Sequence, residues 1–292
     1  MAELRWHPLR QEWVAVAPAR QDRAFLPDDA ECPLCPGGKE IAQSEFDIVV
    51  FDNRHPSLPP IQGKSACEVV VYTDRHNGTF ADLEPDRAER LVEVWLDRYL
   101  ELGALDGAEY LYIFENRGKE VGVTLTHPHG QIYAFSYLPP VIEKAMQAQK
   151  GNARLWRELM QDGATVFEDD HWRCWAPSFA RFPYETWLAP KRHARDLSDL
   201  SLDERRLLGR ALLDIAQRYD ALWADPMPLM MAQYPRPTDG QEHGYWRFHI
   251  IHYPLRRDAH KLKYLAGCET GAGTFITDVL PENAAERLKN AR

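Results

Sequence analysis

Side chains that can do chemistry are concentrated in the segment from Thr126 to Gln131, which reads Thr-His-Pro-His-Gly-Gln. The residues that follow, 132–135, are typical of a strand, in which residues two apart share one face. We therefore expect His127, His129 and the amide of Gln131 on the same side. A neutral imidazole can attack phosphorus, an amide can donate to a phosphoryl oxygen, and a second imidazole can position the first. The segment predicts phosphoryl transfer, with an ordinary strand that happens to carry histidines as the alternative.

The neighbouring residues indicate how this segment is placed. Pro128 fixes φ and has no N–H to donate, so we expect an edge position or the start of a strand. Gly130 should leave the backbone open to an approaching ligand. The polar loop 117–122 could offer backbone N–H groups, a cation and Asn116 to a phosphate, or it could be a plain hairpin connection.

A second set of residues has the spacing of a metal site. Cys32 and Cys35 form a CxxC in a tight turn rich in Pro and Gly, which is typical of a zinc knuckle, although redox pairs share this spacing. His76 and His127 would complete a closed, tetrahedral Cys2His2 site of the structural type. Zinc bound there would hold His127 in place and thereby fix the position of the strand that carries His129. The alternative is a reduced CxxC and a His76 satisfied by other groups.

The elements that must position these residues can be read from hydrophobic periodicity. Runs rich in β-branched and aromatic residues predict strands at 46–51, 67–72, 110–116, 171–175 and 186–190. Apolar residues at helical spacing predict a helix from Pro85 to about Leu102, and a helical region is expected from Pro140 to about Gln161. Residues 6–18 predict a turn followed by a short strand.

An internal repeat links the two parts of the chain. From Tyr99 to His129 is 30 residues, and from Tyr219 to His249 is also 30 residues. The strand predicted at 248–254 is therefore the second counterpart of the histidine segment, although it lacks the Pro, Gly and Gln. We predict a duplicated α+β unit with a mainly antiparallel, half-barrel-like sheet flanked by helices, in which the first copy carries the chemistry and the second is mainly scaffold.

Composition excludes several classes of protein. The net charge of −9 over 292 residues disfavours a nucleic-acid surface, and any anionic substrate must be met by clustered Arg or Lys. No apolar run approaches the roughly 20 residues that cross a bilayer, and the first residues do not resemble a signal peptide. Five cysteines, an odd number, argue against a disulfide framework. We expect a cytoplasmic protein with no nucleic-acid or membrane partner.

Three motifs together resemble the galactose-1-phosphate uridylyltransferases of the histidine-triad superfamily. They are Cys-Pro-Leu-Cys at 32–35, Phe-Glu-Asn-Arg-Gly at 114–118 and His-Pro-His-Gly-Gln at 127–131. The likeness runs over nearly the whole chain, and the Gly-Gln ending is its specific part, since related dinucleoside phosphorylases usually carry a serine-rich version. The resemblance implies a histidine-triad-like half at 1–165 with the zinc site and the nucleophile, and a degenerate half at 166–292 with a hexose-binding segment.

The resemblance also implies roles for individual residues. His129 would be the nucleophile and Gln131 the amide that steadies the uridylyl group, with zinc held by Cys32, Cys35, His76 and His127. Contacts with substrate are implied or expected at Arg20, Arg23, Asn53, Asn116, Gly122, Thr124, Lys263, Tyr264 and Glu269.

The residues implied to contact the substrate fall into groups, according to the part of the substrate that each would contact. The two arginines would face phosphate, Asn53 the uridine and Asn116 the β-phosphate. The segment 263–269 would bind the hexose, with Glu269 toward its hydroxyl groups. Because that segment comes from the neighbouring subunit in the family, a homodimer with shared active sites is implied.

The implied reaction is a ping-pong exchange in which His129 takes UMP from UDP-glucose, releases glucose 1-phosphate, and passes UMP to galactose 1-phosphate. Two alternatives remain. One is a related adenylyltransferase or phosphorylase that acts on ADP-glucose or dinucleoside polyphosphates. The other is a zinc-stabilised nucleotide-binding protein without turnover.

The later half departs from the family pattern. Some members hold a second metal ion with a carboxylate and three histidines, but here His249 alone remains, with Tyr234 and Ile251 at two of the other positions. We therefore expect one zinc ion per chain and no second metal site, with His249 and His252 as core or hydrogen-bonding residues. Cys268 and Phe275 replace more polar residues in the hexose segment, which leaves the preference for galactose open.

Overall fold

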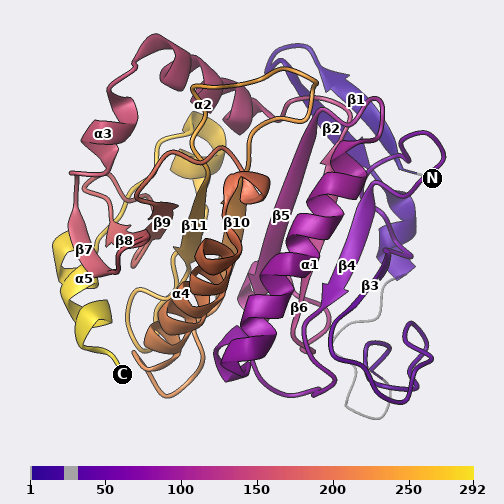
Figure 1. Ribbon diagram of the computed structural model, residues 1–292, viewed down its shortest axis with the longest axis horizontal. Helices are drawn as coiled ribbons and strands as arrows, with labels where there is room; N and C mark the ends of the chain where they lie inside the picture. Colours follow the sequence, from indigo (N-terminus) through magenta and orange to yellow (C-terminus); the bar gives the residue numbers. More distant parts are fainter. Residues whose placement is uncertain (1, 23–31) are drawn as a thin grey trace.

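A nine-stranded sheet forms the frame of the protein in the computed structural model, which describes residues 2–22 and 32–292. Every neighbouring pair of strands in this sheet is antiparallel. Two long helices, α1 (Pro85–Gly103) and α4 (Leu202–Asp220), pack against each other across one face of the sheet (Figure 1). The predicted α+β class with a mainly antiparallel sheet is confirmed.

The remaining elements complete this frame. In sheet order the strands are β3 (Val49–Asp52), β4 (Cys67–Val71), β6 (His129–Phe135), β5 (Tyr110–Arg117), β10 (Leu229–Tyr234), β11 (His249–Pro254), β9 (Thr186–Pro190), β8 (Trp172–Ala176) and β7 (Ala164–Glu168). A separate hairpin is formed by β1 (Glu3–His7) and β2 (Glu12–Val16). The other α-helices are α2 (Pro140–Gly151), α3 (Leu155–Leu159) and α5 (Pro281–Asn290). Among the described residues, no helix has the length and apolar character needed to cross a membrane.

The sheet contains two copies of one strand order, which meet where β5 pairs with β10. The first copy runs β3-β4-β6-β5, and the second runs β10-β11-β9-β8 in the mirrored order. His129 begins β6 and His249 begins β11. In each, ring Nδ1 hydrogen-bonds the backbone carbonyl two residues earlier, at 2.7 and 2.9 Å. The predicted internal repeat is therefore confirmed.

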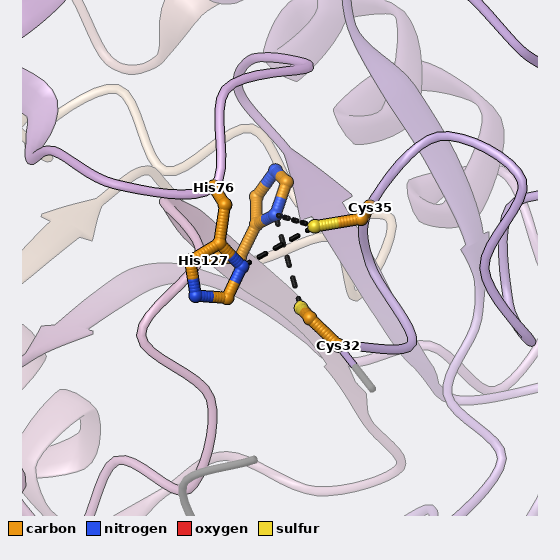
Figure 2. Close-up of side chains that lie close together, drawn as sticks. All are labelled: Cys32, Cys35, His76 and His127. Carbon is orange, nitrogen blue, oxygen red and sulfur yellow. Dashed lines mark hydrogen bonds between the residues drawn. The ribbon is translucent and has the colours of Figure 1, made fainter. Parts of the chain in front are cut away.

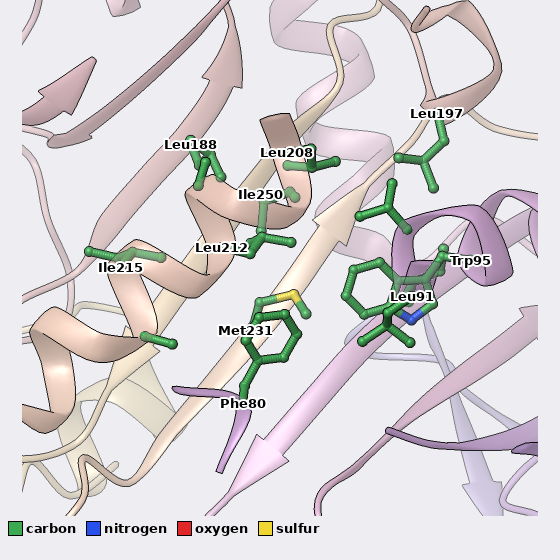
Figure 3. Close-up of a cluster of buried hydrophobic side chains, with 14 of the residues drawn as sticks. Phe80, Leu91, Trp95, Leu188, Leu197, Leu208, Leu212, Ile215, Met231 and Ile250 are labelled. Carbon is green, nitrogen blue, oxygen red and sulfur yellow. The ribbon is translucent and has the colours of Figure 1, made fainter. Parts of the chain in front are cut away.

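The main core lies between the sheet and the two long helices (Figure 3). Leu91 and Trp95 point inward from α1 and Leu212 from α4, and all three are almost fully buried. They meet Met231 of β10 and Ile250 of β11 in one cluster. Each such side chain contributes roughly 1.5–3 kcal/mol of transfer free energy.

Particular residues determine where the two long helices begin and where they approach each other. Pro85 is the first residue of α1, where its missing N–H costs no hydrogen bond. Ser201 and Glu204 form a capping box at the start of α4, with each side chain accepting from the other's backbone N–H at 3.3 and 2.7 Å. The helices approach closely at Gly209, because a Cβ there would lie 2.8 Å from the backbone of Ala88.

Several elements differ from the sequence-based prediction. The helical region expected from Pro140 to about Gln161 consists of two helices, because Asn152 adopts an extended conformation after α2 and the short α3 follows. The first strand of the N-terminal hairpin, β7, β10 and α5 were not predicted. β10 has the sequence Leu-Met-Met-Ala-Gln-Tyr, which lacks β-branched residues, and it is a strand because it pairs on both sides with β5 and β11.

Candidate active site and metal centre

The strand β6 carries the histidine segment and lies inside the sheet, between β4 and β5. Pro128 immediately precedes this strand, so the strand-start alternative is confirmed and the edge alternative is wrong. Along β6 the burial alternates, with Gly130 in the core and His129 and Gln131 on the other, partly exposed face. The prediction that this histidine and this amide share a face is confirmed.

His127 does not share that face, contrary to expectation. Its side chain is buried, and its Nε2 lies 2.7 Å from the carbonyl oxygen of Thr73. The backbone carbonyl of His127, rather than its ring, contacts Nδ1 of His129 at 2.7 Å. A carbonyl can only accept, so Nδ1 of His129 carries the hydrogen and the lone pair of the neutral ring is on Nε2. The main chain of His127 therefore sets the orientation and the tautomer of His129.

Four side chains converge beside this strand, from three distant parts of the chain (Figure 2). Their ligand-type atoms all lie within 4.8 Å of one another. From Sγ to Nδ1 the distances are 3.2 Å for Cys35 and His76, 3.6 Å for Cys35 and His127, and 3.9 Å for Cys32 and His127. Sulfur and nitrogen ligands of a tetrahedral zinc ion lie about 3.5 Å apart. The predicted Cys2His2 cluster is thus assembled, and it can hold a metal ion.

The second nitrogen of each ring in the cluster is also held. Nε2 of His127 hydrogen-bonds Thr73 as described, and Nε2 of His76 lies 3.2 Å from Oγ1 of Thr126. These contacts direct both Nδ1 atoms toward the two cysteines, as outer hydrogen bonds do in metal sites. Burial lowers the pKa of His127, which favours the neutral form that a metal ligand requires.

Two cavities meet at His129, which lines both. The first cavity has a volume of about 270 Å³ and combines apolar and polar walls; its lining includes Leu34, Phe51, Asn53, Arg54, Val69, Thr124, Leu125 and Gln131. The loop-side cavity has a volume of about 250 Å³, and its lining includes Asn116, Arg117, Gly118, Lys119 and Thr126. A substrate with two parts joined at a phosphorus atom could occupy both and present that atom to His129.

The predicted contacts near these cavities are placed as follows. Asn53 and Thr124 line the first cavity, and Asn116 lines the loop-side cavity. Gly122 ends the one-turn helix η4 (Lys119–Val121) with φ of +79°, a conformation that favours glycine. The loop between β5 and β6, which lines the loop-side cavity, therefore has a defined turn at Gly122.

The two predicted phosphate-directed arginines lie before β3. Arg20 donates to the backbone carbonyl of His55 at 2.9 Å, and Oδ1 of Asn53 accepts from the backbone N–H of His55 at 2.9 Å. Both contacts brace the loop that carries Asn53 and Arg54 into the cavity wall. Arg23 lies outside the described residues.

The predicted hexose-binding segment, residues 263–269, follows β11 in the chain. Lys263 and Glu269 are buried and bind each other, and Nζ of Lys263 also donates to the carbonyl of Ile276 at 2.6 Å. Phe275 packs against Phe182 with ring centroids 5.6 Å apart. Within one chain, Lys263 and Glu269 therefore brace this segment, whereas Tyr264 is 71% exposed.

Sequence reasoning missed Tyr133. It lies two residues after Gln131 on the same face of β6, and its hydroxyl donates to Oε1 of Gln131 at 3.1 Å. The period of two in the strand was the signal that could have identified it.

Gly130 serves the buried face of β6, not the open face as expected. A Cβ at this position would lie 2.0 Å from the hydroxyl oxygen of Tyr72 and 3.0 Å from the backbone oxygen of Phe114. Tyr72 is 1% exposed and cannot move into solvent. Glycine is therefore needed so that the strand can lie against this tyrosine while it presents His129 to the cavities.

Replacing Gly130 with alanine is expected to destabilise the protein by about 1–3 kcal/mol, because β6 must move away from Tyr72. Thermal unfolding measures the effect. The second substitution Tyr72→Phe should restore part of the stability, since it removes the nearest atom. Gly151→Ala is the matched control, because a Cβ there meets no atom within 4 Å. Equal unfolding temperatures for Gly130→Ala and Gly151→Ala would contradict this account.

His249, the counterpart of His129, is enclosed by aromatic rings. Its ring stacks on those of Tyr234 and Trp187, with distances between ring centroids of 4.8 and 5.3 Å. Burial lowers the pKa of His249 to about 4. His252 is also buried, lies 3.3 Å from Oγ1 of Thr186, and has a pKa lowered to about 3 by burial. Both are core, hydrogen-bonded residues, as predicted.

We expect stability to fall between pH 6.5 and pH 4 because of these two histidines. In this range the unfolded chain binds protons on His249 and His252 and the folded chain does not, so acid favours unfolding. The lowered pKa of His249 corresponds to about 3 kcal/mol once the pH is below both pKa values. Unfolding temperatures at pH 7.5 and 5 measure the loss, which should be smaller for His249→Phe. His260→Phe, at an exposed histidine, is the control. An equal loss in both variants would refute the assignment.

Comparison with known proteins bears on the family. The sequence model described as the N-terminal domain of galactose-1-phosphate uridyl transferase matches residues 53–139, and that of the C-terminal domain matches residues 119–292. The galactose-1-phosphate uridylyltransferase of Thermotoga maritima is 39% identical over 317 aligned residues, covering 99% of this chain and 98% of the relative. That of Streptomyces lividans is 34% identical, covering 99% of this chain and 86% of the relative.

Solved structures agree with this relationship. A uridylyltransferase structure with 30% sequence identity superimposes with a TM-score of 0.89, covering 100% of this chain and 98% of that one. An ADP-glucose phosphorylase of Arabidopsis thaliana, at 24% identity and a TM-score of 0.79, shares the fold. On the full-length sequence identity, the two matching domain models and the shared fold, this chain belongs to the galactose-1-phosphate uridylyltransferase family.

Proposed function

We propose that this protein exchanges UMP between UDP-glucose and galactose 1-phosphate through a uridylyl-His129 intermediate. The observation that carries the proposal is the position of His129 between two cavities, with its Nδ1 fixed by the carbonyl of His127 and the amide of Gln131 on the same face. The relatives named galactose-1-phosphate uridylyltransferase support the same activity.

In the first half of the reaction, Nε2 of His129 attacks the α-phosphorus of UDP-glucose. An N–P bond forms, the bond from phosphorus to the bridging oxygen breaks, and its electron pair leaves with glucose 1-phosphate. The ring becomes positively charged, and the bond from Nδ1–H to the carbonyl of His127 stabilises that charge. The linked imidazole is a good leaving group, so the intermediate stays reactive.

In the second half, a phosphate oxygen of galactose 1-phosphate attacks the same phosphorus atom. The N–P bond breaks, its electrons return to Nε2 of His129, and UDP-galactose leaves. The amide N–H groups of Gln131 would donate to a non-bridging oxygen in both steps, which lowers the energy of the crowded phosphorus centre. No proton is gained or lost over the cycle.

The two cavities divide the substrate between them in this proposal. The nucleoside would occupy the cavity that contains Asn53 and Thr124, and the sugar phosphate the cavity that contains Asn116 and Lys119. Gly122 would shape the connecting loop. We propose that Arg20 and Arg23 direct phosphate toward the site, Arg20 through the loop that it braces.

We propose zinc as the ion bound by Cys32, Cys35, His76 and His127, with one ion per chain. Two thiolates and two neutral imidazoles are a donor set that zinc prefers, and four protein ligands make a closed, structural site. Such an ion would hold the main chain of His127, and therefore the hydrogen bond that orients His129.

We further propose a homodimer in which Lys263, Tyr264 and Glu269 of one subunit complete the hexose site of the other. The exposure of Tyr264 and Leu265, at 71% and 53%, supports a contact surface at this segment. Light scattering after gel filtration tests the dimer. A monomer that retains full exchange activity would contradict the shared site.

Two broader features of the chain are also proposals. The halves at 1–165 and 166–292 would act as a catalytic unit and a supporting unit. A cytoplasmic location is supported by the five cysteines, none of which forms a disulfide in the described structure.

The activity is tested by mixing the protein with UDP-glucose and galactose 1-phosphate and following glucose 1-phosphate and UDP-galactose. Both products should appear, and a lone substrate should give neither in catalytic amounts. A parallel tube with ADP-glucose and phosphate tests the adenylyl alternative, which would release ADP. Tight nucleotide binding without exchange in any tube would indicate the non-catalytic alternative and overturn the proposal.

A further inference from the structure

We infer that Tyr133 is a positioning residue that holds the Gln131 amide with its N–H groups toward the reacting phosphate. This inference rests on the proposed uridylyl transfer and adds a residue to its machinery. Tyr133 and Gln131 lie two residues apart on the partly exposed face of β6, beside His129.

The hydrogen bonds around Tyr133 have a defined direction. Its hydroxyl donates to Oε1 of Gln131 at 3.1 Å, and it lies 2.9 Å from Oγ of Ser57. A hydroxyl group has one hydrogen, so with that hydrogen on Gln131 the contact with Ser57 must be a bond donated by the serine. The chain of donors therefore runs from Ser57 through Tyr133 to Gln131.

The charge of Arg20 favours the same direction. Its guanidinium acts on the Tyr133 hydroxyl and opposes the rise in the pKa of Tyr133 that burial causes. A nearby cation attracts the hydroxyl oxygen and repels the hydroxyl hydrogen, which turns that hydrogen toward Oε1 of Gln131. Arg20 itself is anchored by its bond to the carbonyl of His55.

The direction matters because an amide side chain can present either end to a ligand. With Oε1 held by Tyr133, the two hydrogens on Nε2 remain for the cavity that Gln131 lines. In the reversed orientation, a carbonyl lone pair would face a negatively charged phosphoryl oxygen and repel it. Tyr133 thus selects the orientation that stabilises the transferring group.

The test is Tyr133→Phe, which removes the hydroxyl and keeps the ring. We expect the single-turnover rate of uridylyl-His129 formation from UDP-glucose to fall about three- to tenfold, the effect of losing one neutral hydrogen bond. In steady state, the loss should appear mainly in kcat rather than KM, since the amide acts on the reacting centre. The matched control is Tyr137→Phe, just beyond the same strand, which should react at the unmodified rate.

A double-mutant cycle separates positioning from a general structural effect. Gln131→Ala alone should slow the reaction by about 10²–10³-fold, as removal of an oxyanion donor does. Tyr133→Phe should have no further effect in that background, because no amide remains to be oriented. An equal effect of Tyr133→Phe with and without Gln131 would overturn the inference, as would an unchanged rate in the single variant.

Two further measurements keep the outcomes distinct. Ser57→Ala leaves the phenol intact and should slow the reaction in the same direction but less, so it provides a second test if Tyr133→Phe folds poorly; an unchanged Ser57→Ala rate would then overturn the inference. Unmodified protein is run alongside. If it forms no uridylyl adduct, both the proposed function and this inference fail. If it reacts and Tyr133→Phe reacts equally fast, this inference alone fails.

Discussion

Replacing His129 with asparagine is expected to reduce uridylyl exchange on the order of 10⁴-fold or more, since the proposed nucleophile is lost. Asparagine is chosen because its amide nitrogen can still donate to the carbonyl of His127, so the start of β6 should keep its conformation. The product UDP-galactose, measured over a long incubation, gives the residual rate. Binding of UDP-glucose should remain, because both cavities keep their other walls.

The control for this variant is His171→Asn, at an exposed histidine in the loop before β8, which should be fully active. Unfolding temperatures within a few degrees for the two variants and the unmodified protein would show that the loss is chemical. A His129→Asn protein with more than about a tenth of normal activity would mean that another group accepts the uridylyl moiety.

Removal of the metal ion is the second large effect that we expect. A chelator, or the substitution Cys35→Ser, should destabilise the protein by several kcal/mol, because the free energy of binding a structural zinc ion contributes to folding. Activity should fall together with stability. The physical reason is that the ion would hold His127, whose carbonyl orients His129. Thermal unfolding with and without chelator, followed by readdition of zinc, measures both effects.

Cys268→Ser is the control, because this cysteine is partly exposed and lies outside the cluster. It should bind one zinc ion per chain and unfold as the unmodified protein does. If Cys35→Ser binds the same amount of zinc, or if chelation leaves the unfolding temperature unchanged, the cluster is not the structural metal site that we propose.

Short motifs were the part of the site that sequence could predict well. The four residues of the candidate metal cluster and the shared face of His129 and Gln131 follow from residue type, CxxC spacing and the period of a strand. The duplication was also visible, because the equal spacing from Tyr99 to His129 and from Tyr219 to His249 reflects two copies of one unit. These signals are local or repeat at fixed intervals, so they can be recognised in the sequence alone.

Features that depend on tertiary contacts could not be predicted. β10 lacks β-branched residues and is a strand because of its two neighbours. The need for glycine at 130 comes from Tyr72, which directly follows β4, and no pattern in the sequence pairs the two. The ionic contact between Lys263 and Glu269 within the chain was not predicted either, whereas their role toward a hexose stays a prediction.

The sequence correctly predicts that His127 positions His129, but the contact is made by its backbone carbonyl and not by its ring. The sequence predicts that the ring of His127 positions His129, because residues two apart in a strand share one face. The strand begins only at His129, so the ring of His127 turns toward the cysteines and its carbonyl meets His129. One residue thereby links the Cys2His2 cluster to His129, through its side chain on one side and its main chain on the other.

The most direct test of the central claim is an intact mass spectrum of the protein after incubation with UDP-glucose, without an acceptor, at neutral to alkaline pH. We predict the addition of one uridylyl group per chain, its absence in His129→Asn, and its loss when galactose 1-phosphate is added. ADP-glucose should give no adduct. An adenylyl adduct from ADP-glucose alone, or a uridylyl adduct that persists in His129→Asn, would contradict the account.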